Sequence, residues 1–540
     1  MSLKMKAKIS EEQMMMSEFK NEPLANFTLE VERKKMMDAL AKVKSEFGRT
    51  YGLHTADQVS SASNVITSRN PAFPDQIIGS TISATKEDAD RALKIVTEGS
   101  KTWKKTPASE RISLLEKLAD WMVSHKYELS AWMVYEVGKS WKEADADTCE
   151  GIDFCRYYAR EMNRLAEPRM TQMVLGENDT LAYFPKGVSV VIAPWNFPFA
   201  ILAGMAVASL VTGNTVIIKP AEQSVVIGAK LAQGLKAVGF PQDAFFFLPG
   251  VGEEIGPMIV NDPRVDIIAF TGSADVGLSI IESAARKPKA GQRGVKKVIA
   301  EMGGKNALII DEDADQDEAI LGATHSAFGF QGQKCSALSR LLVHEKIYDA
   351  FVKRFVEAAS GLKMGDPANP EFQMGPVIDE EAQKRILKTI QDAKTRMKVL
   401  FESKTPAGNG YFVPQTIFEC TDAHEKWFQN EIFGPVILVK KFSTLEEGIE
   451  LVNSVPYALT GGIYSRSPSH IEKAKAEMEV GNLYINRAIT GATVQRHPFG
   501  GFKLSGIGSK AGGPDYLLQF LEARTVSENV VRRGFAGEKA

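Results

Sequence analysis

Cys335 is the residue whose surroundings most favour nucleophilic chemistry. It lies in the segment FGFQGQKCSALSR, where glycines and small polar neighbours would expose the thiol on a loop or at the start of a helix. Lys334 beside it, together with free amides at a helix N-terminus, would favour the thiolate, which is the form that attacks an electrophilic carbon. The alternative is a buried cysteine that acts as a small apolar side chain, which is the usual environment of this residue.

Two polar residues in other segments could complete such chemistry on a carbonyl group. Glu301 ends an apolar run in VIAEMGGK, and burial there would raise its pKa and make it a usable general base. Asn196 is flanked by prolines in APWNFP, and its amide could donate a hydrogen bond to a developing oxyanion. The alternatives are a glutamate that faces water at a sheet edge and an asparagine that makes only local turn hydrogen bonds.

A further set of residues could bind a dinucleotide. Lys219 and Glu222 in KPAEQS directly follow an apolar run, where they could bind ribose hydroxyls. Glu222 would also repel a 2′-phosphate, which favours NAD over NADP. The segment FTGS at 270–273 opens a predicted helix, and its small residues would let a phosphate approach the helix N-terminus.

The hydrophobic pattern predicts two α/β series that would bring these residues together. Helical spacing covers 31–48 and 85–167. From 181 to 300, apolar strand-like runs alternate with helical segments, which predicts a parallel, doubly wound sheet that binds nucleotides at the carboxyl ends of its strands. A second α/β series begins near 305, so we expect a cleft around 296–305, where the two series meet.

Composition excludes several other classes of protein. The 540 residues carry a net charge of −2, which argues against binding nucleic acid through bulk positive charge. The four cysteines are too sparse for a disulfide framework and favour a reduced, cytoplasmic compartment, and no spacing of histidines or cysteines predicts a metal site. The uncharged stretch 187–218 is interrupted by prolines, glycines and asparagines, so we expect no membrane span.

Several short motifs occur in an order and spacing that resemble the NAD(P)-dependent aldehyde dehydrogenase superfamily over about residues 30–535: APWNFP, KPAE, FTGS, EMGGK, GQKCS and EIFGPV. The resemblance implies that Cys335 is the nucleophile, Glu301 the general base and Asn196 the oxyanion donor. It also implies NAD as the cofactor, with the adenosine and pyrophosphate side held by Lys219, Glu222, Ser273 and Val276 and the nicotinamide side by Glu431 and Phe433.

The same resemblance implies a domain organisation. We expect a mobile leader over 1–30, a Rossmann-type NAD-binding domain over 31–300 and an α/β catalytic domain over 301–507. The ribbon-like segment 169–187 and the C-terminal return 508–540 would form a small β oligomerisation domain. In this return, the run at 523–534 is expected to be a late strand that can pair with the edge of a neighbouring subunit, so we expect a homodimer or a larger homo-oligomer.

A narrower resemblance is to the stand-alone bacterial members of this superfamily that oxidise L-glutamate γ-semialdehyde with NAD, the second step of proline degradation. It rests on segments 141–162 and 481–520. There, the backbone N–H groups of Gly491 and Ala492 would bind the α-carboxylate of the substrate. The hydroxyl of Ser336 would add a further contact to the substrate. Phe197 and Phe499 would form an aromatic box around its aliphatic chain, and the carboxylate of Glu150 would lie near its amino group.

Other interpretations stay open at this point. Glu150 could be only a solvated carboxylate on a helix, and the same chemistry could act on another semialdehyde or on an aliphatic aldehyde. A non-catalytic structural or binding protein of this fold would be expected to lack Cys335 or Glu301, and both are present. A cysteine hydrolase would leave the nucleotide-type strand pattern and the KPAE motif without a purpose.

Overall fold

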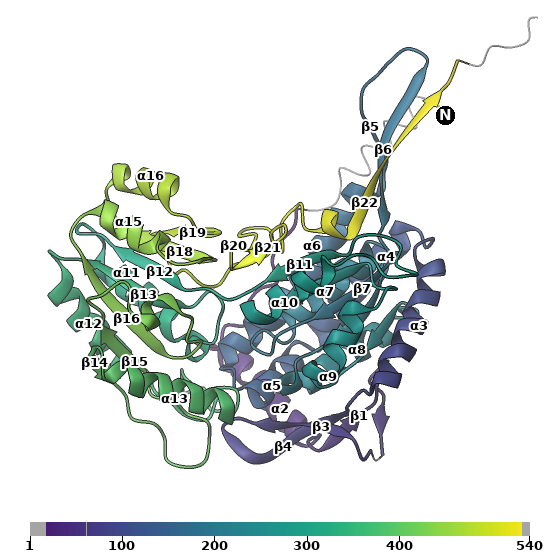
Figure 1. Cartoon of the computed structure of the whole chain (residues 1–540). Coiled ribbons are helices and arrows are strands. Elements are labelled where there is room, and N and C mark those ends of the chain that lie inside the picture. Colours follow the sequence, from purple (N-terminus) through teal and green to yellow (C-terminus); the bar gives the residue numbers. More distant parts are fainter. Residues whose placement is uncertain (1–17, 61, 532–540) are drawn as a thin grey trace, which may run out of the picture.

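A six-stranded sheet forms the half of the molecule that the sequence predicts to bind a nucleotide (Figure 1). The structure is a computed structural model that describes residues 18–60 and 62–531. The sheet has the strand order β21-β11-β10-β7-β8-β9, and its strands run parallel except for β21. The strands are β7 (Val188–Ile192), β8 (Thr215–Lys219), β9 (Phe245–Phe247), β10 (Ile267–Thr271), β11 (Lys297–Glu301) and β21 (Gly506–Ile507).

Helices cover both faces of this sheet because successive strand residues point to opposite sides. Val190 and Ile217 belong to the apolar cluster that includes residues of α3, α9 and α10. Their neighbours Val191 and Ile218 belong to the cluster that includes α7 and α8. The helices are α3 (Lys86–Trp103), α7 (Ala200–Val211), α8 (Val225–Ala237), α9 (Gly252–Asn261) and α10 (Ala274–Ala284). The predicted doubly wound α/β fold is therefore confirmed.

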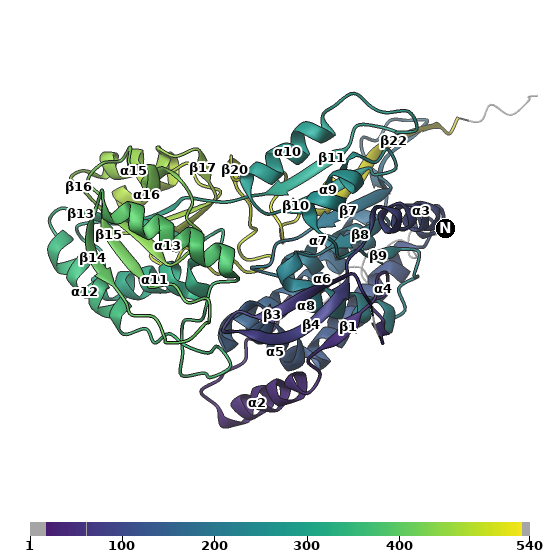
Figure 2. The ribbon, with the colours of Figure 1, turned by 60° about the horizontal axis from the view of Figure 1, so that its bottom comes forward.

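A seven-stranded sheet forms the second half, seen beside the first in Figure 2. Its strand order is β14-β15-β16-β13-β12-β18-β19, and only β14 is antiparallel to its neighbour. The strands are β12 (Asn306–Ile310), β13 (Leu338–His344), β14 (Lys398–Glu402), β15 (Thr416–Glu419), β16 (Val436–Phe442), β18 (Thr460–Tyr464) and β19 (Asn482–Ile485). The helices of this half are α11 (Gln316–Phe328), α12 (Tyr348–Ser360), α13 (Glu380–Lys394), α14 (Lys426–Gln429), α15 (Leu445–Asn453) and α16 (Pro468–Glu477).

The N-terminal part of the chain is helical, as predicted, but it also contains a sheet that the sequence did not predict. The helices are α2 (Glu30–Lys44), α4 (Ala108–Ser124), α5 (Lys126–Val137) and α6 (Trp141–Ala166). The four-stranded sheet has the order β2-β1-β4-β3 and consists of β1 (Arg49–Tyr51), β2 (Gln58–Val59), β3 (Val65–Asn70) and β4 (Phe73–Ile82). Its strands are short or interrupted by register shifts, so no sustained alternation marks them in the sequence.

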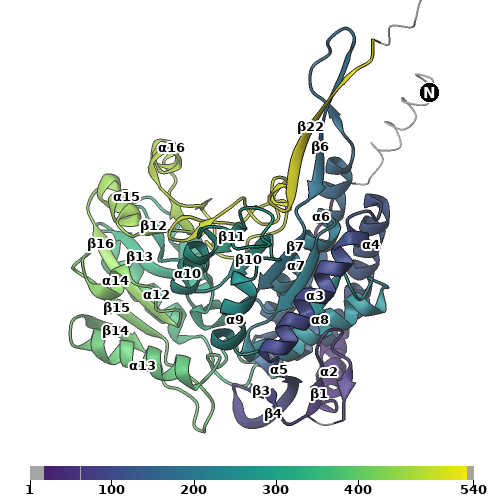
Figure 3. The same cartoon turned by 45° about the vertical axis from the view of Figure 1, so that its right-hand side comes forward.

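A three-stranded ribbon projects from the body of the molecule (Figures 1 and 3). It consists of β5 (Arg169–Met170), β6 (Glu177–Pro185) and β22 (Leu521–Asn529). The late strand expected to meet a neighbouring subunit pairs in this structure with β6 of its own chain, from Leu521 opposite Pro185 to Asn529 opposite Glu177. The remainder of that expected strand, from residue 532 on, lies outside the described residues.

The chain returns from the second half to the first after β19. Two short strands mark this return: β20 (Phe502–Lys503) pairs with β17 (Tyr457–Ala458), and β21 pairs with β11. The last pairing sets Ile507 opposite Ala300 and Gly506 opposite Glu301. Glu301 therefore lies where both halves and the return segment meet, within the region expected to form a cleft.

The expected leader differs from its prediction in the part that the structure describes. Residues 18–29 lie against α6 and are held there by hydrogen bonds from several residues, and residues 1–17 lie outside the described part of the chain. Over 18–60 and 62–531, no helix is long and apolar enough to cross a membrane. The four cysteines all lie in this part of the chain and form no disulfide.

Candidate active site

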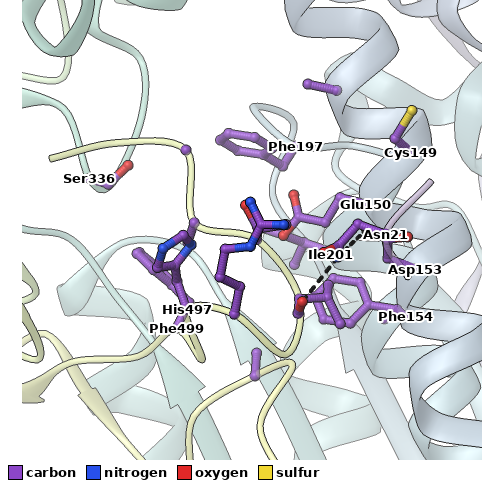
Figure 4. A pocket seen from close by; sticks show the side chains of 18 of the residues that line it. Asn21, Cys149, Glu150, Asp153, Phe154, Phe197, Ile201, Ser336, His497 and Phe499 are labelled. Carbon is purple, nitrogen blue, oxygen red and sulfur yellow. Dashed lines mark hydrogen bonds between the residues drawn. The ribbon is translucent and has the colours of Figure 1, made fainter. Parts of the chain in front are cut away.

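A cavity of about 470 Å³ lies between α6, the turn before β13 and the return segment (Figure 4). It brings together most of the residues expected to act on the substrate: Cys335, Glu301, Ser336, Glu150, Phe197, Phe499, Gly491 and Ala492. Asn196 and the expected cofactor residues are not part of its wall. The cavity therefore unites a thiol, acidic side chains, aromatic rings and a glycine-containing loop that are far apart in the sequence.

Cys335 lies in a turn whose unusual backbone is held from outside. Before it, Phe330 and Gln331 adopt left-handed φ angles of 48° and 56°. Asn306 Nδ2 donates hydrogen bonds to the carbonyl oxygens of Cys335 at 2.7 Å and of Ala337 at 2.8 Å, which fixes the turn to the start of β12. The thiol is thus presented to the cavity by a rigid support rather than by a flexible loop.

The surroundings of the Cys335 thiol disfavour its thiolate form. Burial, reinforced by the nearby carboxylates of Glu431 and Glu301, raises the pKa of the thiol to about 12. Lys334 does not counter this as the sequence suggested, because its ammonium group pairs with Glu143 on α6, with an N–O distance of 2.7 Å. These surroundings therefore do not favour the thiolate that the sequence suggested.

Asn196 is buried next to the cysteine turn. Its Nδ2 donates a hydrogen bond to the carbonyl oxygen of Gln333 at 3.0 Å, two residues before Cys335. Because an asparagine amide carries two N–H bonds, one donor is left for an oxygen atom beside Cys335. The hydrogen bond joins residues that are 137 positions apart, so Asn196 makes more than a local turn contact, and its role as an oxyanion donor stays a prediction.

Glu301 ends β11 and is held by the return segment. Its Oε2 accepts a hydrogen bond from the backbone N–H of Gly501 at 3.1 Å. A side chain on Gly500 would lie 2.7 Å from Oε1, so only glycine allows this close approach. Burial raises the pKa of Glu301 to about 8, although the Gly501 hydrogen bond and Lys510 act in the opposite direction. A carboxyl group with this pKa can exchange protons near neutral pH, as a general base must.

Glu431 lies beside the glycines that follow β11. Its Oε1 accepts a hydrogen bond from the N–H of Gly304 at 3.0 Å, and burial raises its pKa to about 7. Phe433, two residues further, has a positive φ of 56°, and its ring meets Trp195 edge-on with centroids 5.6 Å apart. Both residues are therefore fixed close to the junction of the two halves, where the resemblance expects the nicotinamide.

The other expected cofactor residues lie at the carboxyl ends of β8 and β10. Lys219 Nζ lies 3.2 Å from Glu222 Oε1, which also accepts a hydrogen bond from Gly252 N at 2.6 Å. Ser273 caps α10 with its side chain, and Val276 in the first turn is half exposed. A cation, a carboxylate and an open helix N-terminus are groups that suit the ribose and pyrophosphate of a dinucleotide.

Two features of the site were not predicted. Lys139 is buried and lies over the ring of Phe197, with Nζ 4.0 Å from the ring centroid, and forms an ion pair with Asp147. Asp153 on α6 lines the cavity and is bound by Asn21 from the N-terminal segment. These contacts join residues that are distant in sequence, so neither spacing nor composition signals them.

Among the described residues, no cluster of three or more histidine, cysteine, aspartate or glutamate side chains could hold a metal ion.

The comparison with known families agrees with this geometry. The sequence profile described as the Aldehyde dehydrogenase family matches residues 58–526, and the chain belongs to this family. Cys335 and Glu301, which the sequence predicts to be the nucleophile and the general base, lie in one cavity.

More specific similarities cover nearly the whole chain. The 1-pyrroline-5-carboxylate dehydrogenase of Geobacillus sp. (strain WCH70) is 45% identical over 95% of this chain and 100% of its own length. A crystal structure of 1-pyrroline-5-carboxylate dehydrogenase from Thermus with bound NAD has a TM-score of 0.93 and 45% identity, and covers 96% of this chain and 100% of that one. Proline utilization A from Bdellovibrio bacteriovorus has a TM-score of 0.94 at 50% identity, and this chain spans 54% of its length.

We expect the substitution Glu301→Gln to raise the melting temperature at a pH of about 9 but not at a pH of about 5. The pKa of Glu301 in the folded protein is about 8, above its value in the unfolded chain, so stability from the protonated form is lost as the pH rises through about 8. Glutamine does not titrate and avoids this loss. Thermal unfolding of both proteins at both pH values checks the expected gain, on the order of 2–4 °C.

The matched control is Glu357→Gln, since Glu357 is exposed on α12. Its melting temperature should follow that of the unchanged protein at both pH values. An equal shift for Glu301→Gln at low and high pH would show that Glu301 is not held neutral by burial.

Proposed function

We propose that this chain oxidises L-glutamate γ-semialdehyde, which forms when 1-pyrroline-5-carboxylate takes up water, to L-glutamate with NAD. The observation that carries this proposal is the single cavity that holds Cys335 together with Glu150 and the backbone of Gly491 and Ala492. Such a cavity offers a nucleophile for an aldehyde and separate groups for an ammonium and a carboxylate. The full-length relatives named 1-pyrroline-5-carboxylate dehydrogenase support the same reaction, which is the second step of proline degradation.

Recognition of the amino-acid end rests on the loop at 490–494 and on α6. Gly491 has a φ of 75°, and a Cβ there would meet no atom within 4 Å, so open space lies beside this loop. Its backbone N–H groups would bind an anion in that space. Ser336 adds a hydroxyl to the same cavity. Burial raises the pKa of Glu150 to about 8, and a substrate ammonium group would restore its charged form. Phe197 and Phe499 enclose the aliphatic chain between these ends.

The chain's own residues carry out both halves of the reaction. The Cys335 thiol releases its proton to water, and its Sγ forms a bond to the aldehyde carbon as the carbonyl π bond breaks. Asn196 Nδ2 and the Cys335 backbone N–H donate hydrogen bonds to the oxygen that becomes negative. NAD, when bound, accepts the hydride that leaves this carbon. Glu301 then takes a proton from a water molecule whose oxygen adds to the thioester carbon, and the thiol leaves as L-glutamate forms. The pKa of about 8 for Glu301 suits this proton transfer.

The residues at the ends of β8 and β10 fit NAD. Lys219 and Glu222 would bind the adenosine ribose, and the carboxylate of Glu222 would repel the extra phosphate of NADP. Ser273 and Val276 would place the pyrophosphate at the N-terminus of α10. Glu431 and Phe433 would position the nicotinamide ribose and ring at the junction of the two halves. We place the reaction in the cytoplasm, in line with four cysteines that form no disulfide.

The projecting ribbon supports assembly into a homodimer or a larger homo-oligomer. Apolar side chains on the ribbon are exposed in the single chain. Met173 has a relative solvent exposure of 84%, and Leu175 is fully exposed. The edges formed by β5 and β22 have no partner strand on their outer sides in this three-stranded sheet. Exposed apolar groups next to open strand edges favour pairing with a second copy.

We expect the substitution Cys335→Ala to reduce turnover to below about 1% of that of the unchanged enzyme, because the thiol forms the only covalent bond to the substrate. NAD affinity should stay within about twofold, since Cys335 takes no part in holding the cofactor. Reduced-cofactor absorbance measures turnover, and calorimetry measures NAD binding. Turnover well above that level would show that Cys335 is not the nucleophile.

We expect Ser336→Ala to lower kcat/KM for 1-pyrroline-5-carboxylate by about tenfold, because loss of a hydrogen bond to a charged group costs about 1.5 kcal/mol or more. The kcat/KM for pentanal, which has no carboxylate, should stay nearly constant. Both substrates are compared in the variant and in the unchanged enzyme, which should strongly prefer 1-pyrroline-5-carboxylate. Equal efficiency of the unchanged enzyme on both aldehydes would leave only the family assignment.

Light scattering at micromolar concentration should give a molar mass of at least twice that of one chain. The physical reason is the exposed apolar ribbon, whose burial in an assembly is favourable. A monomer under these conditions would contradict the proposed assembly. Val174→Asp on the ribbon, where Val174 is exposed, should weaken the assembly without affecting the distant cavity.

A further inference from the structure

An N-terminal segment, which we call the strap (residues 19–25), forms part of the wall of the catalytic cavity. Four of its residues line this cavity: Asn21, Glu22, Pro23 and Leu24. The strap runs along α6, on which Glu150 and Asp153 lie. Residues from the two ends of the chain therefore enclose the same space, because the loop that contains Gly491 forms another part of the wall.

Asn21 connects this strap to the substrate-binding loop. Its Nδ2 donates one hydrogen bond to Asp153 Oδ2 at 2.8 Å and another to the carbonyl oxygen of Val494 at 3.0 Å. Both N–H bonds of the amide are thereby used. Figure 4 shows Asn21 between the cavity and Asp153 on α6. Through one side chain, the helix that carries Glu150 and the loop that carries Gly491 are fixed relative to each other.

The two partners of Asn21 are firmly placed themselves. The second oxygen of Asp153, Oδ1, accepts a hydrogen bond from Glu22 N at 2.7 Å. Val494 is buried, and the next residue, Gln495, has a positive φ of 67° and donates its N–H to Gly512 O at 2.9 Å. The loop thus has a strained backbone at one end, and its conformation depends on such external hydrogen bonds.

Other residues of the strap bind α5 and α6 directly, and these contacts do not involve Asn21. Ala25 N donates to Asp145 Oδ2 at 2.7 Å, and Lys126 Nζ donates to the carbonyl oxygen of Pro23 at 2.6 Å. Arg156 forms an ion pair with Glu22 at 2.8 Å. Removing the Asn21 amide therefore loosens the link to the loop but leaves the strap attached to α5 and α6.

We propose that Asn21 is a positioning residue for substrate specificity. It holds the 491–494 loop at the spacing from α6 at which the backbone N–H groups of Gly491 and Ala492 meet the α-carboxylate while Glu150 meets the ammonium. This inference rests on the proposed function, since it assigns the recognition of the amino-acid end to a spacing between two elements. An aldehyde without these two charged groups does not depend on that spacing.

The test compares Asn21→Ala with Asn21→Asp and with the control Asn26→Ala in the full chain. Asn26 follows the strap and is exposed. Its Oδ1 accepts hydrogen bonds from the backbone N–H and the hydroxyl of the nearby Thr28. We expect Asn21→Ala to raise KM for 1-pyrroline-5-carboxylate about tenfold with kcat within about twofold, the loss expected for a binding contact present in ground and transition states. The kcat/KM for pentanal should stay constant, and Asn26→Ala should behave as the unchanged enzyme.

Asn21→Asp adds a directional check. It keeps the size of the side chain but sets an acceptor against the acceptors Asp153 Oδ2 and Val494 O, so it should impair KM at least as much as Asn21→Ala. Equal losses on 1-pyrroline-5-carboxylate and pentanal, or no loss on either, would overturn the proposal.

Hydrogen exchange separates failure of this proposal from failure of the proposed function. In Asn21→Ala, the amides of residues 491–497 should exchange at least about threefold faster than in the unchanged protein and in Asn26→Ala, whichever substrate the enzyme prefers. Unchanged exchange there would overturn the positioning role. If exchange accelerates but the unchanged enzyme shows no preference for 1-pyrroline-5-carboxylate, the loop depends on Asn21 and the assigned substrate is wrong.

Discussion

The pairing of β21 with β11 is the constraint on which the rest of the site depends. Strand β11 of the first sheet ends at Glu301, and the chain then crosses into the second half, which contains Cys335. Only the return of residues 502–508 to the edge of the first sheet, with Met302 N bound to Ser505 O at 2.8 Å, closes the two halves around a shared space. Lys510 Nζ supports the return by donating to the carbonyl oxygens of Gly481 and Gly500 at 2.6 Å. Glu301, Cys335 and the loop at 490–494 lie on separate elements, and this return brings them to one cavity.

Closing the site in this way buries several carboxyl groups, and the structure offsets the cost with backbone donors. Glu301 is bound by Gly501 N, and Glu431 by Gly304 N. A single backbone hydrogen bond does not outweigh desolvation, so the pKa values of both groups stay raised, to about 8 and about 7. Burial also raises the pKa of Glu150, to about 8.

The sequence predicted the parts of this protein that are local and failed where contacts are long-range. Apolar runs identified most strands of both large sheets, and residue type with local spacing singled out Cys335 and Glu301, which the structure places in one cavity. The charged, Met-rich start of the chain suggested a mobile leader, yet Asn21 is fixed by a partner 132 residues away. The proposed effect of Lys334 on the thiol also failed, since its distant partner Glu143 on α6 directs the ammonium elsewhere. Such partners are set by the tertiary fold and leave no spacing signal.

The buried ion pair between Lys139 and Asp147 shows how the scaffold orders the groups around the nucleophile. The pair has an N–O distance of 2.8 Å and no exposure to solvent, so desolvation offsets much of its attraction, and its main consequence is positional. Asp147 Oδ1 also accepts a hydrogen bond from Ala200 N at 2.6 Å, at the start of α7. Lys139 Nζ lies over the rings of Phe197 at 4.0 Å and Phe330 at 4.8 Å. One cation thus joins α6, α7, the loop that carries Asn196 and the turn that presents Cys335. Asn196 and Cys335, the proposed oxyanion donor and nucleophile, are therefore held relative to each other by a contact that touches neither.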